Sequence, residues 1–90
     1  MADLSLISKI NATIKRFFDE NPDVQRIAAK ELMPYFIEDK VFTYNHRDGL
    51  PIREVLRDLD RQNRLNLIPY VVPERKTRNT YWFFIRLSEK

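Results

Sequence analysis

The most regular alternation of apolar and charged positions lies in residues 51–64. When each residue is assigned a rotation of about 100°, the aliphatic positions fall within an arc of about 100°: Ile52, Val55, Leu56 and Leu59. By the same count, four arginines share an arc of about 80° on another side: Arg53, Arg57, Arg61 and Arg64. The pattern predicts one amphipathic helix with a buried aliphatic side. Asp48 can cap it, Pro51 suits its first turn, and Asn63 suits a left-handed end.

Two earlier segments also have helical spacing. In the first, a stripe recurs at Leu6/Ile7, Ile10, Ile14 and Phe17/Phe18. Asp3 or Ser5 can cap this helix, and Asn21-Pro22 should end it because the residue before a proline is pushed out of the α region. The second begins at about Ala28, and its expected buried side is Ala28, Leu32, Phe36 and Ile37. Pro34 either kinks this helix or lies in the first turn of a new one.

The C-terminal part of the chain predicts a β-hairpin. Residues 67–72 and 80–87 are rich in β-branched and aromatic side chains, which favours two strands. Residues 73–79 between them are too many for a two-residue turn and predict an open loop. Pro69 cannot donate to a sheet ladder, so the first strand should be an edge strand. Residues 23–27 form a further short extended segment.

The predicted order of elements resembles the winged helix-turn-helix superfamily. Three segments carry the resemblance: Ala28-Ala29-Lys30-Glu31-Leu32, Pro51-Ile52-Arg53-Glu54-Val55-Leu56-Arg57-Asp58-Leu59 and Tyr81-Trp82-Phe83-Phe84-Ile85. It implies an α+β fold in which residues 1–90 form a single domain of three helices and a C-terminal hairpin. It also implies that the short extended segment pairs with the second hairpin strand. The connection over residues 41–49 is long for that family, and Pro34 interrupts its second helix.

Composition narrows the class of protein. A chain of 90 residues with 43% hydrophobic and 32% charged residues is one globular domain. It has no cysteine and no apolar run long enough to span a membrane, so we expect a cytoplasmic protein without a membrane partner. Residues 1–49 carry seven basic and eight acidic side chains, whereas residues 50–90 carry nine and five. The positive excess therefore lies in the last helix and the hairpin.

This charge distribution favours binding to double-stranded DNA. If the docking mode of the winged helix family applies, the third helix enters the major groove and the hairpin tip contacts the backbone. The expected contacts are Arg53, Arg57, Arg61 and Arg64 from the helix and Arg75, Lys76 and Arg78 from the hairpin. The opposing interpretation is a solvated helix face. Three acidic residues at i,i+3 or i,i+4 spacing could pair with these arginines: Glu54 with Arg57, Asp58 with Arg61, and Asp60 with Arg64.

The alternative function is protein–protein interaction, with homodimerisation as the simplest case. Both faces of the predicted hairpin carry large apolar side chains, whereas a half-solvated antiparallel sheet should alternate apolar and polar residues. We expect one face to cover the helical core and the other to need a partner. The predicted interface residues are Val71, Trp82 and Phe84. The first helix or the C-terminal tail could instead fold over this face.

Enzyme chemistry is not expected. The sequence offers no nucleophile, base and orienting residue at recognisable spacing, and its one glycine argues against a glycine-rich phosphate loop. His46 is the only histidine, and a single histidine without cysteine is a poor metal site. We therefore predict no cofactor, no metal and no small-molecule substrate.

Overall fold

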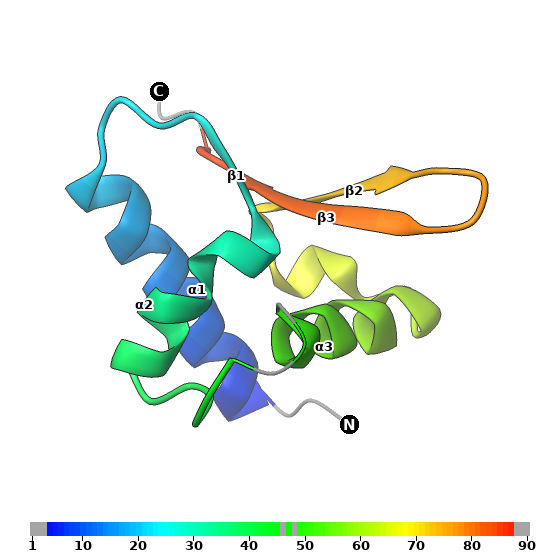
Figure 1. Ribbon diagram of the computed structural model, residues 1–90, viewed down its shortest axis with the longest axis horizontal. Helices are drawn as coiled ribbons and strands as arrows, with labels where there is room; N and C mark the ends of the chain where they lie inside the picture. Colours follow the sequence, from blue (N-terminus) through cyan, green and yellow to red (C-terminus); the bar gives the residue numbers. More distant parts are fainter. Residues whose placement is uncertain (1–3, 46, 48, 88–90) are drawn as a thin grey trace.

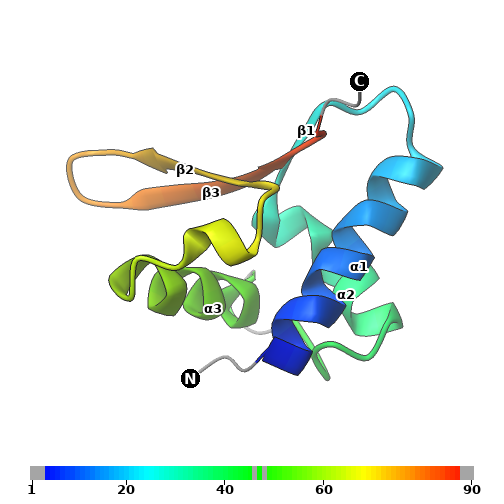
Figure 2. The ribbon, with the colours of Figure 1, turned by 180° about the vertical axis from the view of Figure 1, so that it is seen from behind.

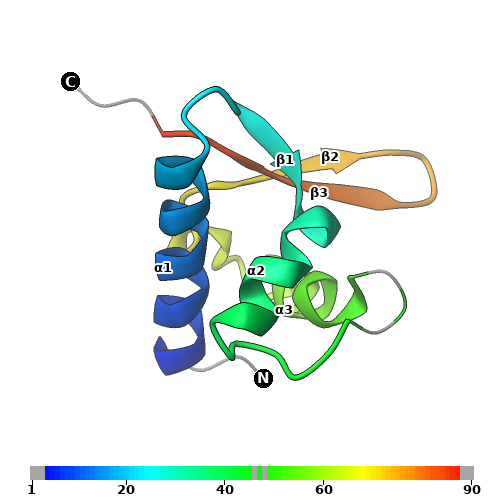
Figure 3. The ribbon, with the colours of Figure 1, turned by 60° about the vertical axis from the view of Figure 1, so that its left-hand side comes forward.

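The computed structural model describes residues 4–45, 47 and 49–87. Within these residues the fold is α+β, with three α-helices and a three-stranded antiparallel sheet (Figure 1). The helices are α1 (Leu4–Glu20), α2 (Met33–Glu38) and α3 (Leu50–Arg61), and the strands are β1 (Arg26–Ala28), β2 (Val71–Arg75) and β3 (Thr80–Ile85). The sheet lies on one side of the helices, as Figure 3 shows. None of the helices described has the length and apolar character needed to cross a membrane.

Helix α1 confirms the predicted apolar stripe and the predicted end before Asn21-Pro22. Asp3 lies outside the described residues, and Ser5 lies within the helix rather than at its cap. The C-terminal end of the helix is held by a residue that the sequence did not single out. The Arg86 guanidinium donates to the carbonyl oxygens of Phe18 at 3.0 Å, Asn21 at 2.6 Å and Val24 at 3.0 Å. Arg86 thereby ties the chain after β3 to the last turn of α1 and to the turn that follows it.

The second predicted helix is divided in two. A 3-10 turn, η1 (Ala29–Leu32), precedes α2, and Pro34 lies in the first turn of α2, where its missing N–H costs no hydrogen bond. Of the two alternatives for Pro34, the new turn is therefore the one observed. Leu32 and Phe36 are buried as predicted, whereas Ala28 and Ile37 are only half-buried. Residues 23–27 were predicted to be extended, and β1 begins at Arg26 within that segment.

Helix α3 begins at Leu50 and ends three residues earlier than predicted. Its predicted aliphatic side packs inward, with Ile52, Leu56 and Leu59 buried and Val55 half-buried against the core. Asn63 has a φ of 60°, which confirms the left-handed end. Asp48 lies outside the described residues. The N-terminal position is Gly49, whose N–H donates to the side-chain oxygen of Asn45 at 2.7 Å.

Gly49 also sets how closely α3 approaches η1. Its φ is 92°, in the left-handed region that glycine adopts without strain. A Cβ built at this position would overlap the side chain of Lys30 and lie 2.8 Å from its Cα. Glycine is therefore required here by both the backbone conformation and the close packing.

The sheet has the order β1-β3-β2, so the short extended segment pairs with the second hairpin strand as expected. The first hairpin strand was predicted wrongly. It covers Val71–Arg75 rather than residues 67–72, because the preceding residues form a 3-10 turn, η2 (Leu65–Leu67), and Ile68 enters the core. The loop is shorter than predicted, since the Lys76 N–H donates to the Asn79 carbonyl at 2.7 Å. Strand β3 ends at Ile85, two residues earlier than predicted.

Pro73, rather than Pro69, is the proline of the edge strand. The Tyr70 carbonyl accepts from Ile85 and the Lys76 N–H donates to Asn79, so even-numbered positions of β2 hydrogen-bond to β3. Because these groups alternate along a strand, position 73 faces the open side of the sheet. Its missing N–H therefore costs no ladder bond, and it weakens the ability of this edge to pair with another strand.

The predicted exposure of Trp82 and Phe84 is wrong. Trp82 is 5% exposed and Phe84 is 0% exposed, because this face of β3 covers the helical core. The Phe84 ring meets the Phe36 ring edge to face, with centroids 6.3 Å apart. Val71 is half-buried beside them. The chain's own helices cover this face of the sheet. Val71, Trp82 and Phe84 therefore do not form a free surface for a partner.

The aliphatic side of α3 makes a test of the fold. Leu56 is fully buried, so Leu56→Ala should lower the free energy of unfolding by about 2–5 kcal/mol. Urea denaturation followed by circular dichroism measures the change. Leu4→Ala removes the same atoms from a side chain that is 70% exposed, and it should have little effect. Equal losses in both variants would contradict the observed orientation of α3.

Candidate nucleic-acid interface

A cleft separates α3 from the hairpin formed by β2 and β3. Both elements extend to the same side of the molecule, as Figures 1 and 2 show from opposite directions. The cleft has a volume of about 820 Å³. Its walls are basic and aromatic: Ala28, Lys30, Arg53, Arg57, Asp60, Arg78, Asn79, Thr80, Tyr81, Trp82 and Phe83. It therefore collects cations from η1, α3 and the hairpin loop.

Arg53 and Lys30 lie where α3 crosses η1. Arg53 is half-buried, and its Nη2 donates to the Arg47 carbonyl oxygen at 2.8 Å. Its Nε is buried and has no hydrogen-bond partner among the described residues. Lys30 is exposed and lies against Gly49 at the start of α3. The close crossing at Gly49 therefore places both cations at the same end of the cleft.

Arg57 and Arg78 face the cleft from opposite sides. Arg57 is exposed on α3, one turn after Arg53, and Arg78 is exposed in the loop between β2 and β3. Within the described part of the chain, neither guanidinium makes an ion pair or hydrogen bond. An unpaired guanidinium keeps its donors for a planar anionic group such as a phosphate or carboxylate. These two predicted site residues are therefore well placed for an external anion.

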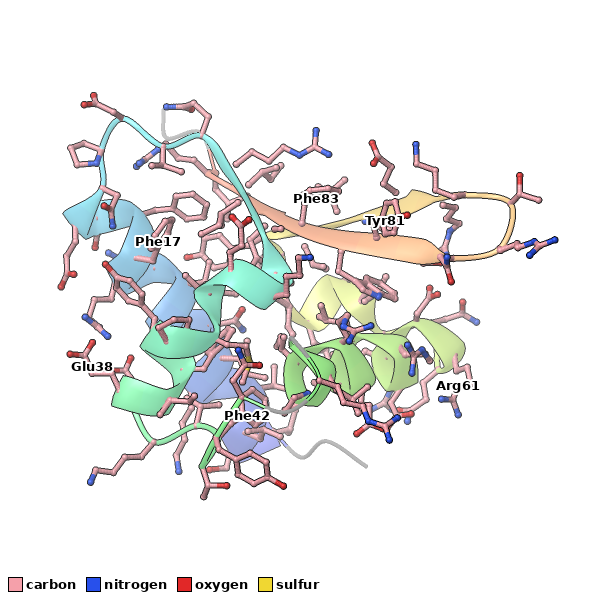
Figure 4. The ribbon with its side chains drawn as sticks, viewed as in Figure 1. Phe17, Glu38, Phe42, Arg61, Tyr81 and Phe83 are labelled. Atoms are coloured by element: carbon pink, nitrogen blue, oxygen red, sulfur yellow. The ribbon has the colours of Figure 1, made fainter. Side chains whose placement is uncertain are left out.

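The other predicted contacts lie outside the cleft. Arg61 is exposed on the last turn of α3 and pairs with Asp58 at 3.1 Å, and Figure 4 shows it at the outer end of the helix. Arg64 is exposed just beyond Asn63. Lys76 is exposed beside β2, 3.8 Å from Glu74. They extend the basic surface along α3 and the hairpin without lining its cavity.

Arg75 is not available in the way the sequence predicted. Its Nη1 and Nη2 donate to the two carboxylate oxygens of Asp60 at 3.0 and 2.9 Å. These bonds lower the pKa of Asp60 and raise the pKa of Arg75. The pair joins α3 directly to β2. Arg75 therefore positions the hairpin against the helix, and it neutralises Asp60, the one carboxylate among the described residues that line the cleft.

The acidic residues of α3 pair differently from the predicted pattern. The Asp58–Arg61 pair forms, but Asp60 bonds to Arg75 across space rather than to Arg64 along the helix. Glu54 has no ion pair with Arg57. Arg57 is thus left without the ion pair to Glu54 that the i,i+3 spacing predicted.

The outer face of the hairpin carries the remaining aromatic residues, labelled in Figure 4. Tyr81 is 49% exposed, and Phe83 is half-buried. The Arg26 guanidinium lies 3.9 Å from the centroid of the Phe83 ring, where cation–π attraction holds it. Arg26 also approaches Glu74 at 3.5 Å. The apolar residues on this face are thus partly covered by a charged pair.

Among the charged residues of the cleft, sequence reasoning missed two, Lys30 and Asp60. Lys30 lies on a different element from the arginines, and only the three-dimensional crossing at Gly49 brings them together. Asp60 was expected to belong to the helix surface. The isolated glycine before Pro51 was the one signal of a close approach, because glycine is used where backbones come near each other.

Comparison with known proteins adds no assignment. No family model matches the chain, and neither a curated protein nor a solved structure matches it significantly. In the described ranges, no three acidic or histidine side chains converge as a metal site would require. His46 lies outside those ranges.

Asp60 provides a pH-dependent test of the hairpin position. Its pKa is below 3.8 in the folded protein because Arg75 donates to it, so the pair stabilises the fold above that value and is lost as the pH falls through the folded pKa. Asp60→Asn should speed amide hydrogen exchange in the hairpin at neutral pH. The stability difference from the parent protein should shrink in acid.

Asp58→Asn is the matched control, because the partner of Asp58 lies on the same helix. It should leave hairpin exchange unchanged. If the two variants have the same effect on hairpin exchange, Asp60 does not position the hairpin.

Proposed function

We propose that the protein is a winged helix-turn-helix protein that binds double-stranded DNA through α3 and the hairpin. The order of elements supports this proposal: three helices precede a hairpin, and β1 pairs with the second hairpin strand. The connection from α2 to α3 is longer than a tight helix-turn-helix turn. It nevertheless leaves α3 packed against η1 at Gly49.

One observation carries the proposal. Four cations surround a single cleft between a helix and a hairpin: Lys30, Arg53, Arg57 and Arg78. Among the described residues that line it, the only carboxylate is that of Asp60, which is already bonded to Arg75. The cleft therefore has a net positive charge, and its principal acid does not compete with an incoming phosphate.

The dimensions of the elements fit a duplex. A helix such as α3 is narrow enough for the major groove, which is about 12 Å wide. With its buried side against the core, α3 presents Arg57 and Arg61 to the surroundings. Arg78 at the hairpin end then lies beside the helix, where it can contact the neighbouring phosphate backbone. Lys76 and Arg64 add positive charge at the two margins.

The proposal predicts salt-dependent binding to a random-sequence duplex. Arg57→Gln should weaken binding by about tenfold and reduce the slope of log affinity against log salt by about one, because one phosphate contact is lost. Arg78→Gln should act in the same direction. Fluorescence anisotropy with a labelled duplex at several salt concentrations measures both quantities.

Lys9→Gln is the control, because Lys9 is an exposed cation on α1 and not a lining residue of the cleft. It should change neither quantity appreciably. Binding without a salt slope, or equal losses in all three variants, would refute the proposed interface.

A further inference from the structure

Strand β3 has an open edge that faces the cleft. On one side it pairs with β2 along Thr80–Phe84, but on the other side its pairing with β1 stops at Ala28 opposite Phe83. The chain then turns into η1. Thr80, Tyr81 and Trp82 therefore have no neighbouring strand on the β1 side among the described residues, and all three line the cleft.

Hydrogen-bond alternation shows which backbone groups face this open edge. The Ile85 N–H donates toward β2, to Tyr70 at 2.9 Å, and the Arg86 N–H donates toward the β1 side, to Gln25 at 2.9 Å. Backbone groups of successive residues point to opposite sides of a strand. Thr80 and Trp82 are even-numbered like Arg86, so their N–H and C=O groups point to the β1 side. The ladder that pairs Ala28 with Phe83 ends on the Trp82 carbonyl, so the groups at the open edge are the N–H and C=O of Thr80 and the N–H of Trp82.

The outer edge of β2 differs from the open part of β3. The outer edge of β2 contains Pro73, which has no N–H to offer a further strand. The open part of β3 contains no proline. Strand addition is therefore disfavoured at β2 and allowed at β3, where the cleft provides space beside the strand.

We propose that the open edge of β3 binds a short, extended, acidic peptide by strand addition. Main-chain hydrogen bonds to Thr80 and Trp82 would hold such a peptide. Successive side chains of the peptide would then point to opposite faces of the sheet. The peptide side chains on one face would lie near Arg53 and Arg57, whose guanidinium groups bind carboxylates. Those on the other face would lie near Tyr81 and Phe83, whose rings pack against apolar groups. The partner is thus a protein segment that alternates acidic and β-branched residues.

This inference goes beyond the proposed function, but it uses part of the same surface. A peptide in the cleft would occupy Arg53 and Arg57 and would leave Arg61 and Arg64 outside. It would therefore compete with DNA for the arginines that the cleft supplies. Such a segment would act as an inhibitor of DNA binding through the same charges that attract phosphate.

Nuclear magnetic resonance of the labelled protein tests the inference without DNA. The probe is a capped peptide of alternating glutamate and valine, titrated into the protein. It should shift the amide signals of Thr80 and Trp82 and slow their exchange with solvent. A matched peptide with methylated backbone nitrogens on its edge-facing residues should bind about tenfold more weakly, because it cannot donate to the strand.

Two protein variants separate a specific site from general attraction between charges. Arg57→Gln should weaken peptide binding, whereas Arg61→Gln, on the same helix but outside the cleft, should not. The absence of peptide binding, or equal binding of the methylated peptide, would refute strand addition. Failure of the peptide experiment would leave salt-dependent DNA binding intact, and failure of DNA binding would leave the peptide result intact.

Discussion

The burial of one face of β3 against the helices determines the arrangement of the rest of the molecule. Trp82 and Phe84 fill the core, and Phe84 meets Phe36 from α2. Because side chains alternate along a strand, this burial turns Tyr81 and Phe83 to the opposite face. It also fixes which backbone edge of β3 lies beside α3. The cleft, its aromatic wall and the open strand edge all follow from this one orientation.

A second constraint sets the charge of the cleft. Asp60 could have cancelled the field of Arg57, which lies one turn away on the same helix. Its two bonds to Arg75 direct that carboxylate to the hairpin instead. The same pair joins β2 to α3, so the position of the hairpin and the net charge of the cleft depend on one bidentate contact. Their coupling is a property of the folded molecule and not of either segment alone.

Local patterns were sufficient to predict α1 and α3 but not the division of the second helix or the hairpin boundaries. The stripes of α1 and α3 were read correctly because helical spacing and buried packing agree in both. The first hairpin strand was misplaced because Leu65, Leu67 and Ile68 are apolar for a different reason, namely their packing against the core at the 3-10 turn η2. The exposure of Trp82 was misjudged because its cover comes from helices distant in sequence. Lys30 and Asp60 escaped notice for the same reason, since their partners lie on other elements.

The single glycine of the sequence determines how closely α3 approaches η1. At Gly49 the backbone of α3 lies against Lys30 with only a hydrogen atom between them. The absence of a side chain at residue 49 sets this short crossing distance. Lys30 and Arg53 therefore line the same cleft although both side chains are cationic. The steric fit at residue 49 therefore determines where Lys30 and Arg53 line the cleft, and any side chain larger than a hydrogen atom there would move the two walls apart.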